Sequence, residues 1–315
     1  MKILLIGGTN FIGPVLTEQL TQTGHDVSLF HRNLNPTAQH HQIQGNCNNV
    51  NDLSRAIEAV EPDVIIHMIA LFQSQIQILE QALQGKKTRS IILSSLDVYK
   101  AYEVLCRLSN DSVVSVPLTE QAPLRDVLYP YRGRLDTDFA HDYEKILVEK
   151  AAIESSVIDA IVLRLGMVYG RNDPNHRFLE PIQKMFHDEK QIELFKDMAN
   201  CRMSKGYVGD IAYGIKLAAE TGLPGEIYNL ASHEALTELE WYQQIAKLME
   251  WEGDIVVSQS SPSLDGLNLT QDLVLDTSKI RKQLGYKERF STQEGLLDTI
   301  QWEFEKMGQS PNQAR

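Results

Sequence analysis

The hydrophobic pattern opens with an apolar run at residues 3–6 in which no polar residue alternates. A strand that is apolar on both faces is typical of a parallel sheet covered by helices on its two sides. Gly7, Gly8 and Gly13 follow directly, and apolar positions then recur at helical spacing to residue 20. Strand, glycine turn and helix in this order direct backbone N–H groups and the positive end of a helix towards a pyrophosphate.

Similar strand and helix patterns alternate along most of the chain. Strands are predicted at residues 25–30, 42–45, 62–70, 89–99, 158–166 and 225–231, and helices at residues 52–60, 76–83, 138–154, 211–221, 238–251 and 292–307. The alternation fails between residues 172 and 201, and residues 203–210 are expected to be extended. This pattern predicts an α/β fold, a Rossmann-like doubly wound parallel sheet of about seven strands with a smaller, interleaved C-terminal substrate lobe.

The pattern also divides the chain into parts. We expect residues 1–170 and 206–231 to form the dinucleotide-binding domain, and residues 171–205 and 232–307 to form the substrate lobe. Residues 308–315 are expected to be a disordered tail, because chain ends without apolar anchors are poorly ordered.

The first turn carries the spacing Gly7-x-x-Asn10-x-x-Gly13, which is the glycine pattern of short-chain dehydrogenases with asparagine at the middle position. Asparagine tolerates left-handed backbone angles better than other non-glycine residues, so the turn is expected to survive the change. The predicted cofactor-binding residues of this turn are Gly7, Thr9, Asn10, Phe11, Ile12 and Gly13. The alternative is the glycine-rich first turn of another doubly wound protein, such as a flavodoxin-like domain.

The residues that follow the second strand bear on the choice of cofactor. NAD-binding proteins place an acidic residue there, which holds the ribose hydroxyls. This chain has His31, Arg32 and Asn33 instead, and Arg32 suits a bidentate contact with a 2′-phosphate. We therefore expect NADP as cofactor, bound by His31 and Arg32, with NAD possible; the alternative is an arginine on a solvated loop.

Composition narrows the function classes. The net charge of −12 and the isoelectric point near 5.2 disfavour nucleic acid and anionic membranes as partners. No apolar run is long enough to span a bilayer. Three widely spaced cysteines favour a reducing cytoplasm over a disulfide framework. No metal site is predicted, since His40, His41 and Cys47 have no fourth ligand at a recognisable spacing.

Two further stretches carry candidate chemistry. The strand at residues 89–99 runs out into Ser94 and Ser95, and catalytic groups gather at the carboxyl ends of strands in this architecture. The proline-rich loop that follows contains Tyr129, Tyr131 and Arg132, and such loops commonly line pockets. The alternatives are a serine that caps backbone groups and a packed Tyr-Pro corner.

Seven motifs in order resemble the extended short-chain dehydrogenase/reductase family, the NAD-dependent epimerase/dehydratase group. They are Gly7-Gly-Thr-Asn-Phe-Ile-Gly13, Asp63-Val-Ile-Ile-His67, Ser94-Ser-Leu-Asp-Val-Tyr99, Leu163-Arg-Leu-Gly-Met-Val-Tyr-Gly170, Gly206-Tyr-Val-Gly-Asp-Ile-Ala212, Tyr228-Asn-Leu-Ala231 and Asp276-Thr-Ser-Lys-Ile-Arg-Lys-Gln-Leu-Gly285. The first turn and the stretch that ends at Arg132 look like an atypical branch, which also resembles chloroplast stem-loop RNA-binding proteins and isoflavone-reductase-like proteins.

The resemblance implies a catalytic Tyr-x-x-x-Lys pair, in which lysine binds the nicotinamide ribose and lowers the pKa of the tyrosine, with Ser95 steadying the substrate oxygen. Lys145 aligns with the family lysine, which places His141 where the tyrosine belongs. Tyr143 lies two residues from Lys145, about 200° around an ideal helix, so it is not expected to share the lysine's side.

Three interpretations remain open at this point. His141 acts as the proton donor or acceptor, Tyr129 or Tyr131 reaches in from the loop, or the protein binds a dinucleotide without catalysis as a regulator, scaffold or RNA-associated factor. The catalytic candidates are Ser95, His141 and Lys145.

The family also implies a small-molecule substrate: a nucleotide-sugar, or else a small carbonyl or hydroxyl compound, changed by hydride transfer. Tyr131, Arg132, Arg164 and Arg171 are the candidate substrate contacts. The family further implies a homodimer, formed by the predicted helices at residues 76–83 and 138–154.

Overall fold

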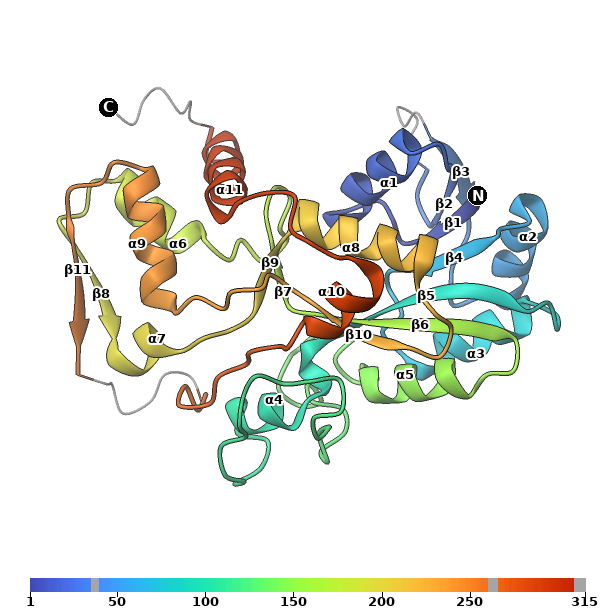
Figure 1. Cartoon of the computed structure of the whole chain (residues 1–315), viewed down its shortest axis with the longest axis horizontal. Coiled ribbons are helices and arrows are strands. Elements are labelled where there is room, and N and C mark those ends of the chain that lie inside the picture. Colours follow the sequence, from blue (N-terminus) through green and yellow to red (C-terminus); the bar gives the residue numbers. More distant parts are fainter. Residues whose placement is uncertain (35–39, 260–265, 309–315) are drawn as a thin grey trace.

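A seven-stranded parallel sheet forms the centre of the larger lobe (Figure 1). The computed structural model describes residues 1–34, 40–259 and 266–308. The strand order is β10-β6-β5-β4-β1-β2-β3. The strands are β1 (Lys2–Ile6), β2 (Asp26–His31), β3 (His41–Gln44), β4 (Val64–His67), β5 (Thr88–Ser95), β6 (Ile158–Leu165) and β10 (Ile227–Leu230). All seven predicted strands are therefore confirmed, as is the doubly wound α/β fold.

Helices cover both faces of this sheet. One face carries α1 (Ile12–Gln22), α8 (Val208–Thr221) and α10 (Ser278–Leu284), and the other carries α2 (Val50–Val60), α3 (Gln73–Ala82) and α5 (Lys145–Glu154). In β1, Ile3 and Leu5 belong to the core on the first face, whereas Leu4 and Ile6 belong to the core on the second. The apolar run at residues 3–6 is thus buried on both sides, as its pattern predicts.

A smaller lobe lies beside the sheet domain and has its own apolar core, which includes Tyr169, Trp241 and Phe304 (Figure 1). It contains α6 (Leu179–Phe186), β8 (Gln191–Phe195), α7 (Lys196–Asn200), α9 (Glu238–Leu248), β11 (Asp254–Ser258) and α11 (Thr292–Lys306). A short ladder between β7 (Met167–Tyr169) and β9 (Lys205–Tyr207) lies where the chain passes between the lobes. Within the segment expected to form the lobe, α10 packs instead on the sheet domain through Ile280 and Leu284.

The predicted helix at residues 138–154 is wrong in its first half, because α5 begins only at Lys145. The backbone N–H of Glu144 donates to the Leu71 carbonyl at 3.1 Å and not to a carbonyl four residues earlier. The Glu144 side chain caps the helix by accepting from the Ile146 N–H, and it also forms a buried ion pair with Arg125. Tertiary contacts of one buried glutamate therefore set the start of the helix.

Two further features complete the fold. The 3₁₀ turn η1 (Leu96–Val98) and the short helix α4 (Lys100–Leu105) continue the chain from the end of β5. No helix in the described ranges is long and apolar enough to cross a membrane. Of the predicted tail, only Gly308 lies within the described residues.

Candidate functional site

The glycine turn joins β1 to α1, and its backbone leaves no room for side chains. A Cβ atom on Gly13 would lie 2.3 Å from the carbonyl carbon of Gly8, and Gly7 has a φ of +83°. The other positive φ in this turn, 49°, belongs to Phe11, whereas the Asn10 carbonyl accepts the Gly13 N–H at 2.9 Å. The expectation that asparagine takes the left-handed position is therefore wrong: the residue after it does.

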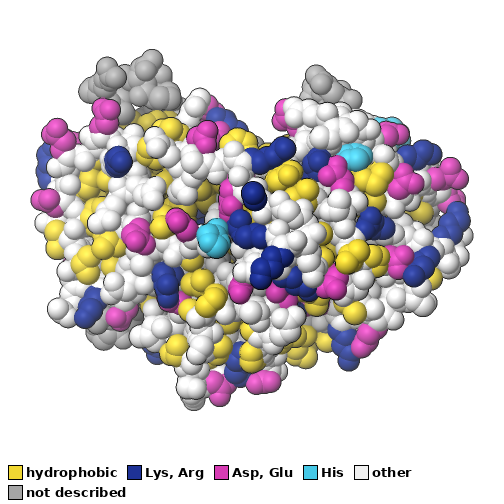
Figure 2. Space-filling model, in the orientation of Figure 1, with side chains coloured by type: hydrophobic (Ala, Val, Ile, Leu, Met, Phe, Trp, Pro, Cys, Tyr) yellow, Lys and Arg dark blue, Asp and Glu magenta, His cyan; other side chains and the backbone are white. Residues whose placement is uncertain are grey.

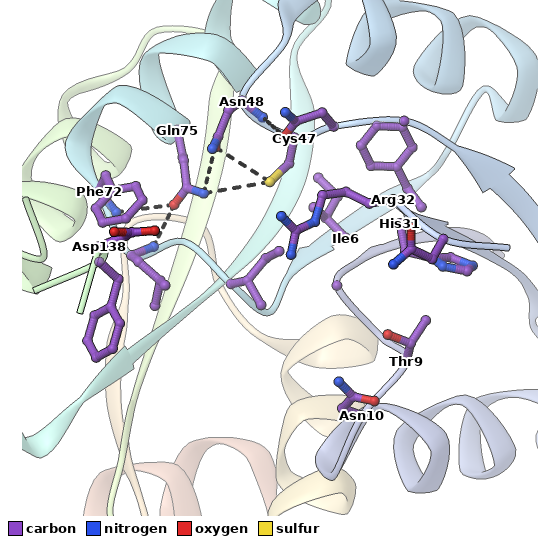
Figure 3. A pocket seen from close by; sticks show the side chains of 18 of the residues that line it. Ile6, Thr9, Asn10, His31, Arg32, Cys47, Asn48, Phe72, Gln75 and Asp138 are labelled. Atoms are coloured by element: carbon purple, nitrogen blue, oxygen red, sulfur yellow. Dashed lines mark hydrogen bonds between the residues drawn. The ribbon is translucent and has the colours of Figure 1, made fainter. Parts of the chain in front are cut away.

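A cavity of about 740 Å³ opens over this turn (Figure 3). Five of the predicted cofactor residues line it, namely Gly7, Thr9, Asn10, His31 and Arg32. Phe11 and Ile12 instead pack against the core beneath the sheet, and Gly13 lies against the Gly8 backbone. The cavity sits at the carboxyl ends of β1 and β2, where a doubly wound sheet binds its ligand.

Gln75 fixes the wall of the cavity opposite the turn. Its side-chain carbonyl accepts the backbone N–H groups of Leu71 at 2.7 Å and Phe72 at 3.2 Å, and its amide donates to the Asn48 side chain at 2.9 Å. Figure 3 shows these bonds together with the Cys47 thiol, whose pKa is raised by burial. The polar groups of this wall therefore form hydrogen bonds with one another, which hold the wall in place without a ligand.

Arg32 is the cation nearest the middle of this cavity. Figure 3 shows its guanidinium turned inwards from the end of β2. Within the described residues no ion pair holds it, and its one hydrogen bond there is accepted by its backbone carbonyl from the Gln44 side chain. An arginine without a carboxylate partner in an open cavity is available to an anionic group of a ligand.

A second cluster lies at the carboxyl end of β5, centred on the buried carboxyl group of Asp97. The Tyr143 hydroxyl donates to Asp97 Oδ2 at 2.7 Å, and the Tyr131 hydroxyl donates to the same oxygen at 3.1 Å. The Asp97 backbone N–H donates to Ser95 Oγ at 3.2 Å. Burial raises the pKa of Asp97, and burial together with the Asp97 carboxylate raises the pKa of Tyr143 well above its usual value, which Ser95 partly opposes.

Lys145 lies beside this cluster and is itself buried. Its Nζ donates to the carbonyls of Ala70 at 2.7 Å and Leu93 at 2.9 Å, and it lies 5.7 Å from the centre of the Tyr143 ring. Burial lowers the pKa of Lys145 to about 8, against the opposing pull of Asp97 and Glu149. The structure thus brings together Ser95 and Lys145, as predicted, and adds Tyr143.

Tyr143 reaches this place because it precedes the helix. The argument that two residues on one helix face different ways does not apply, since α5 begins at Lys145 and Glu144 is extended, with φ −158° and ψ 97°. The expectation that Tyr143 and Lys145 face different sides therefore rested on a wrong premise, namely that both residues lie on one helix. The missing information was the break at Glu144, which depends on partners far away in the chain, Leu71 and Arg125.

His141 lies elsewhere. Its side chain is 72% exposed, and its Nδ1 lies 2.7 Å from a carboxylate oxygen of Asp142. The Arg132 Nε donates to the His141 carbonyl at 2.9 Å, and its guanidinium stacks over the Tyr129 ring. The structure therefore brings neither His141 nor Arg132 to Lys145, whereas Tyr131 from the same loop does reach Asp97.

The two arginines expected to face a substrate are both held by carboxylates. Arg164 is buried and donates to Glu149 at 2.7 Å, and it also donates to the Tyr99 hydroxyl at 3.0 Å. Arg171 donates to Glu305 at 2.7 Å and pairs with Asp298 within the smaller lobe. Neither guanidinium is free to meet a phosphate in this conformation.

Asp97 is the site residue that the sequence prediction missed. A signal was present, because an aspartate two residues after Ser95 at a strand end is unusual for a fully buried position. Another acidic group, Glu103 with Asp111 and Asp126, offers a possible cation site, but the Lys100 ammonium already lies within 2.8 Å of an oxygen of each. That group carries its own counter-ion.

Several known proteins are similar to this chain in sequence. The dTDP-glucose 4,6-dehydratase of Streptomyces niveus is 28% identical over 145 residues, which are 46% of this chain and 42% of that protein. The UDP-N-acetyl-alpha-D-glucosaminuronate decarboxylase of Bacillus cytotoxicus is 23% identical over 96% of this chain and 97% of its own length. The chloroplast stem-loop binding protein of 41 kDa b from Arabidopsis thaliana is 21% identical over 96% of this chain and 79% of its own length.

The fold has solved counterparts as well. The UDP-glucuronic acid 4-epimerase of Bacillus cereus, solved in complex with UDP-glucuronic acid and NAD, superposes with a TM-score of 0.71 at 20% identity, covering 97% of this chain and all of that one. The profile of the NAD dependent epimerase/dehydratase family matches residues 3–231, which include the glycine turn, Asp97, Tyr143 and Lys145. The chain therefore belongs to the NAD dependent epimerase/dehydratase family.

Proposed function

We propose that this protein is an NAD(P)-dependent oxidoreductase of the epimerase/dehydratase type, which moves a hydride between a nicotinamide and a hydroxyl or carbonyl carbon of its substrate. One observation carries the proposal. Ser95, Asp97, Tyr143 and Lys145 meet at the carboxyl ends of β4 and β5, next to the cavity over the glycine turn. Hydride transfer needs groups that exchange protons with the substrate, and it needs a cavity for the dinucleotide beside them. Both lie at the same edge of the sheet.

The proton route follows from the hydrogen bonds. Burial and the neighbouring Asp97 raise the pKa of Tyr143, so its hydroxyl holds the proton of the hydrogen bond to Asp97. In the proposed route Asp97 takes part as the carboxylate. When a substrate hydroxyl gives its proton to Tyr143 Oη, the Tyr143 proton passes along the 2.7 Å bond to Asp97 Oδ2. The hydroxyl group of Ser95 and the positive charge of Lys145 then stabilise the substrate oxygen as it loses its proton. Asp97 acts as the base through Tyr143, and a tyrosinate need not accumulate.

For the cofactor we propose NADP in preference to NAD. NAD is the cofactor seen in the solved epimerase from Bacillus cereus. In this chain, support for NADP comes from Arg32, which is turned into the cavity and unpaired among the described residues, and from the absence of a carboxylate at His31, Arg32 and Asn33. A guanidinium there attracts the 2′-phosphate, whereas an acidic residue repels it.

For the substrate we propose a nucleotide-sugar, because two relatives and the solved epimerase are named for sugar nucleotides. The alternative, a non-catalytic or RNA-associated protein, is favoured by the similarity to the chloroplast stem-loop binding protein. Against it stand the net charge of −12 and the acidic side chains that are interspersed with basic ones over the face in Figure 2.

The test is a turnover assay. The full chain with NADP or NAD is incubated with UDP-glucose, dTDP-glucose and UDP-glucuronic acid, and the products are followed by NMR. We expect conversion of at least one sugar nucleotide, lost in Tyr143→Phe and kept in His141→Ala. Tight cofactor binding without conversion, together with binding of a structured RNA, would support the non-catalytic alternative instead.

We also propose a homodimer in a reducing compartment such as the cytoplasm. Support for the dimer comes from the outer faces of α3 and α5, where Ile153 is 38% exposed beside the half-buried Ile78. Support for the compartment is that Cys47, Cys106 and Cys201 are all free thiols. Sedimentation of the full chain should give twice the monomer mass, and Ile153→Glu should reduce it to the monomer; a monomer before substitution rejects the dimer.

A further inference from the structure

The cavity over the glycine turn lies next to the proton-transfer cluster, which consists of Ser95, Asp97, Tyr143 and Lys145, but the two are not continuous. Of the described residues, those that line the cavity include Ile69, Leu71 and Phe139, but not Ser95, Tyr143 or Lys145. Lys145 is buried, and its ammonium group donates to the backbone carbonyls of Ala70 and Leu93. A wall therefore separates the glycine turn from the groups that would act on a nicotinamide.

Ile69 forms one part of this wall. Its side-chain carbons lie 2.8 to 2.9 Å from the point where a Cβ atom of Gly7 would be, so the side chain rests on the Gly7 backbone. The next residue, Ala70, supplies a carbonyl to Lys145. Ile69 thus contacts the glycine turn through its side chain and directly precedes the residue that holds Lys145. Its backbone is fixed, because the neighbouring Met68 N–H donates to Ile6 and the Leu71 carbonyl accepts from Glu144.

Phe139 forms the other part. Its ring lines the cavity and makes edge contacts with the rings of Tyr143 at 6.1 Å and Tyr131 at 6.4 Å. It therefore stands between the open cavity and the two tyrosines on Asp97. Phe139 is 38% exposed, and the turn that carries it, residues 137–142, belongs to no helix or strand. Ile69 is equally exposed and also lies in a turn, but it follows β4 by only two residues, whereas Phe139 lies six residues before α5. We therefore take Phe139 as the wall residue that moves.

We propose that in this conformation the cavity binds an adenine nucleotide alone, and that Ile69 and Phe139 are specificity-determining side chains that exclude the nicotinamide half until Phe139 moves aside. The inference rests on the proposed function, since it concerns the same cofactor site. Adenosine phosphates that lack nicotinamide then compete with the whole dinucleotide on nearly equal terms, because both use the same contacts.

The test compares two ligands by calorimetry on the full chain, NADP and adenosine 2′,5′-bisphosphate. For the unaltered protein we expect dissociation constants within about threefold of each other, since the contacts that the nicotinamide half gains are offset by the displacement of Phe139. Phe139→Ala should tighten NADP binding by about tenfold and leave the bisphosphate unchanged, because only the dinucleotide must displace the ring. Ile69→Ala should act in the same direction. NADPH emission should rise on binding to Phe139→Ala more than on binding to the unaltered protein.

Phe290→Ala is the matched control, because Phe290 is equally exposed at 39% and lies away from this cavity. It should change neither constant. Phe139→Leu guards against misfolding, and it should tighten NADP binding less than Phe139→Ala does. If NADP binds the unaltered protein far more tightly than the bisphosphate and no variant improves it, the inference is wrong while the proposed function stands. If neither ligand binds, both are wrong.

Discussion

The two ends of the candidate site are built in different ways. The nucleotide end is an open cavity over a turn whose residues are neighbours in sequence, from Gly7 to Gly13. The proton-transfer end is closed, and it gathers Ser95, Asp97, Tyr131, Tyr143 and Lys145 from segments that only tertiary contacts bring together. The nucleotide end can be predicted from a local sequence motif, whereas the proton-transfer end depends on the residue at which α5 begins.

The largest expected effect distinguishes the two candidate proton donors at the closed end. Tyr143→Phe should lower turnover by about 10²- to 10⁴-fold, the range that a lost acid–base group costs, with cofactor affinity unchanged. His141→Ala should leave turnover within about twofold, because surface substitutions away from a site have small effects. Steady-state rates on the converted sugar nucleotide measure both. A large loss in His141→Ala with none in Tyr143→Phe would reverse the assignment.

A smaller effect is expected at the open end. Arg32→Ser should weaken NADP binding by about tenfold or more, the loss of about one charge-assisted contact worth 1.4 kcal/mol, and leave NAD binding unchanged. Arg107→Ser is a control, since Arg107 is not among the cavity's described lining residues. Fluorescence titration with both cofactors measures the ratio. Equal losses for NADP and NAD would mean that Arg32 does not contact a 2′-phosphate.

The last prediction concerns stability and not cofactor binding or turnover: it is the pH dependence of unfolding caused by His67, the fully buried residue at the end of β4. Burial and the nearby Lys145 lower the pKa of His67 to about 3. The unfolded chain takes up this proton near pH 6.5, so stability is lost as the pH falls from there towards 3, by about 1.4 kcal/mol per pH unit from this group. His67→Leu should have a shallower acid limb in urea unfolding between pH 4 and about 6.5. Parallel limbs would contradict the assignment.

The same contrast explains what the sequence could predict. Strands such as residues 3–6 follow from local apolar patterns, and the glycine turn follows from its spacing, so both were predicted. The start of α5 at Lys145 was not, because the Glu144 N–H bonds to Leu71 and its carboxylate bonds to Arg125, and no local pattern encodes these partners. Placing Tyr143 and His141 on one helix with Lys145 was wrong because of that single boundary.

Arg164 and Arg171 show a related limit. An arginine at a strand end suggests a phosphate contact from sequence. In the structure, burial of Arg164 demands a counter-ion, which Glu149 supplies, whereas Arg171 is 36% exposed and pairs with Glu305. Asp97 is the converse case. Among the described residues, only the hydroxyls of Tyr143 and Tyr131 donate to its carboxylate, and a buried carboxylate held in this way is more available for chemistry than one held by a guanidinium.

The most direct measurement is a crystal structure of the full chain grown with saturating NADP. The account predicts the diphosphate over the glycine turn, the 2′-phosphate on Arg32, Phe139 displaced, and the Tyr143 hydroxyl beside the nicotinamide ring with Lys145 at its ribose. A nicotinamide that lies beside His141, or a turn that stays empty at saturating cofactor, would contradict it.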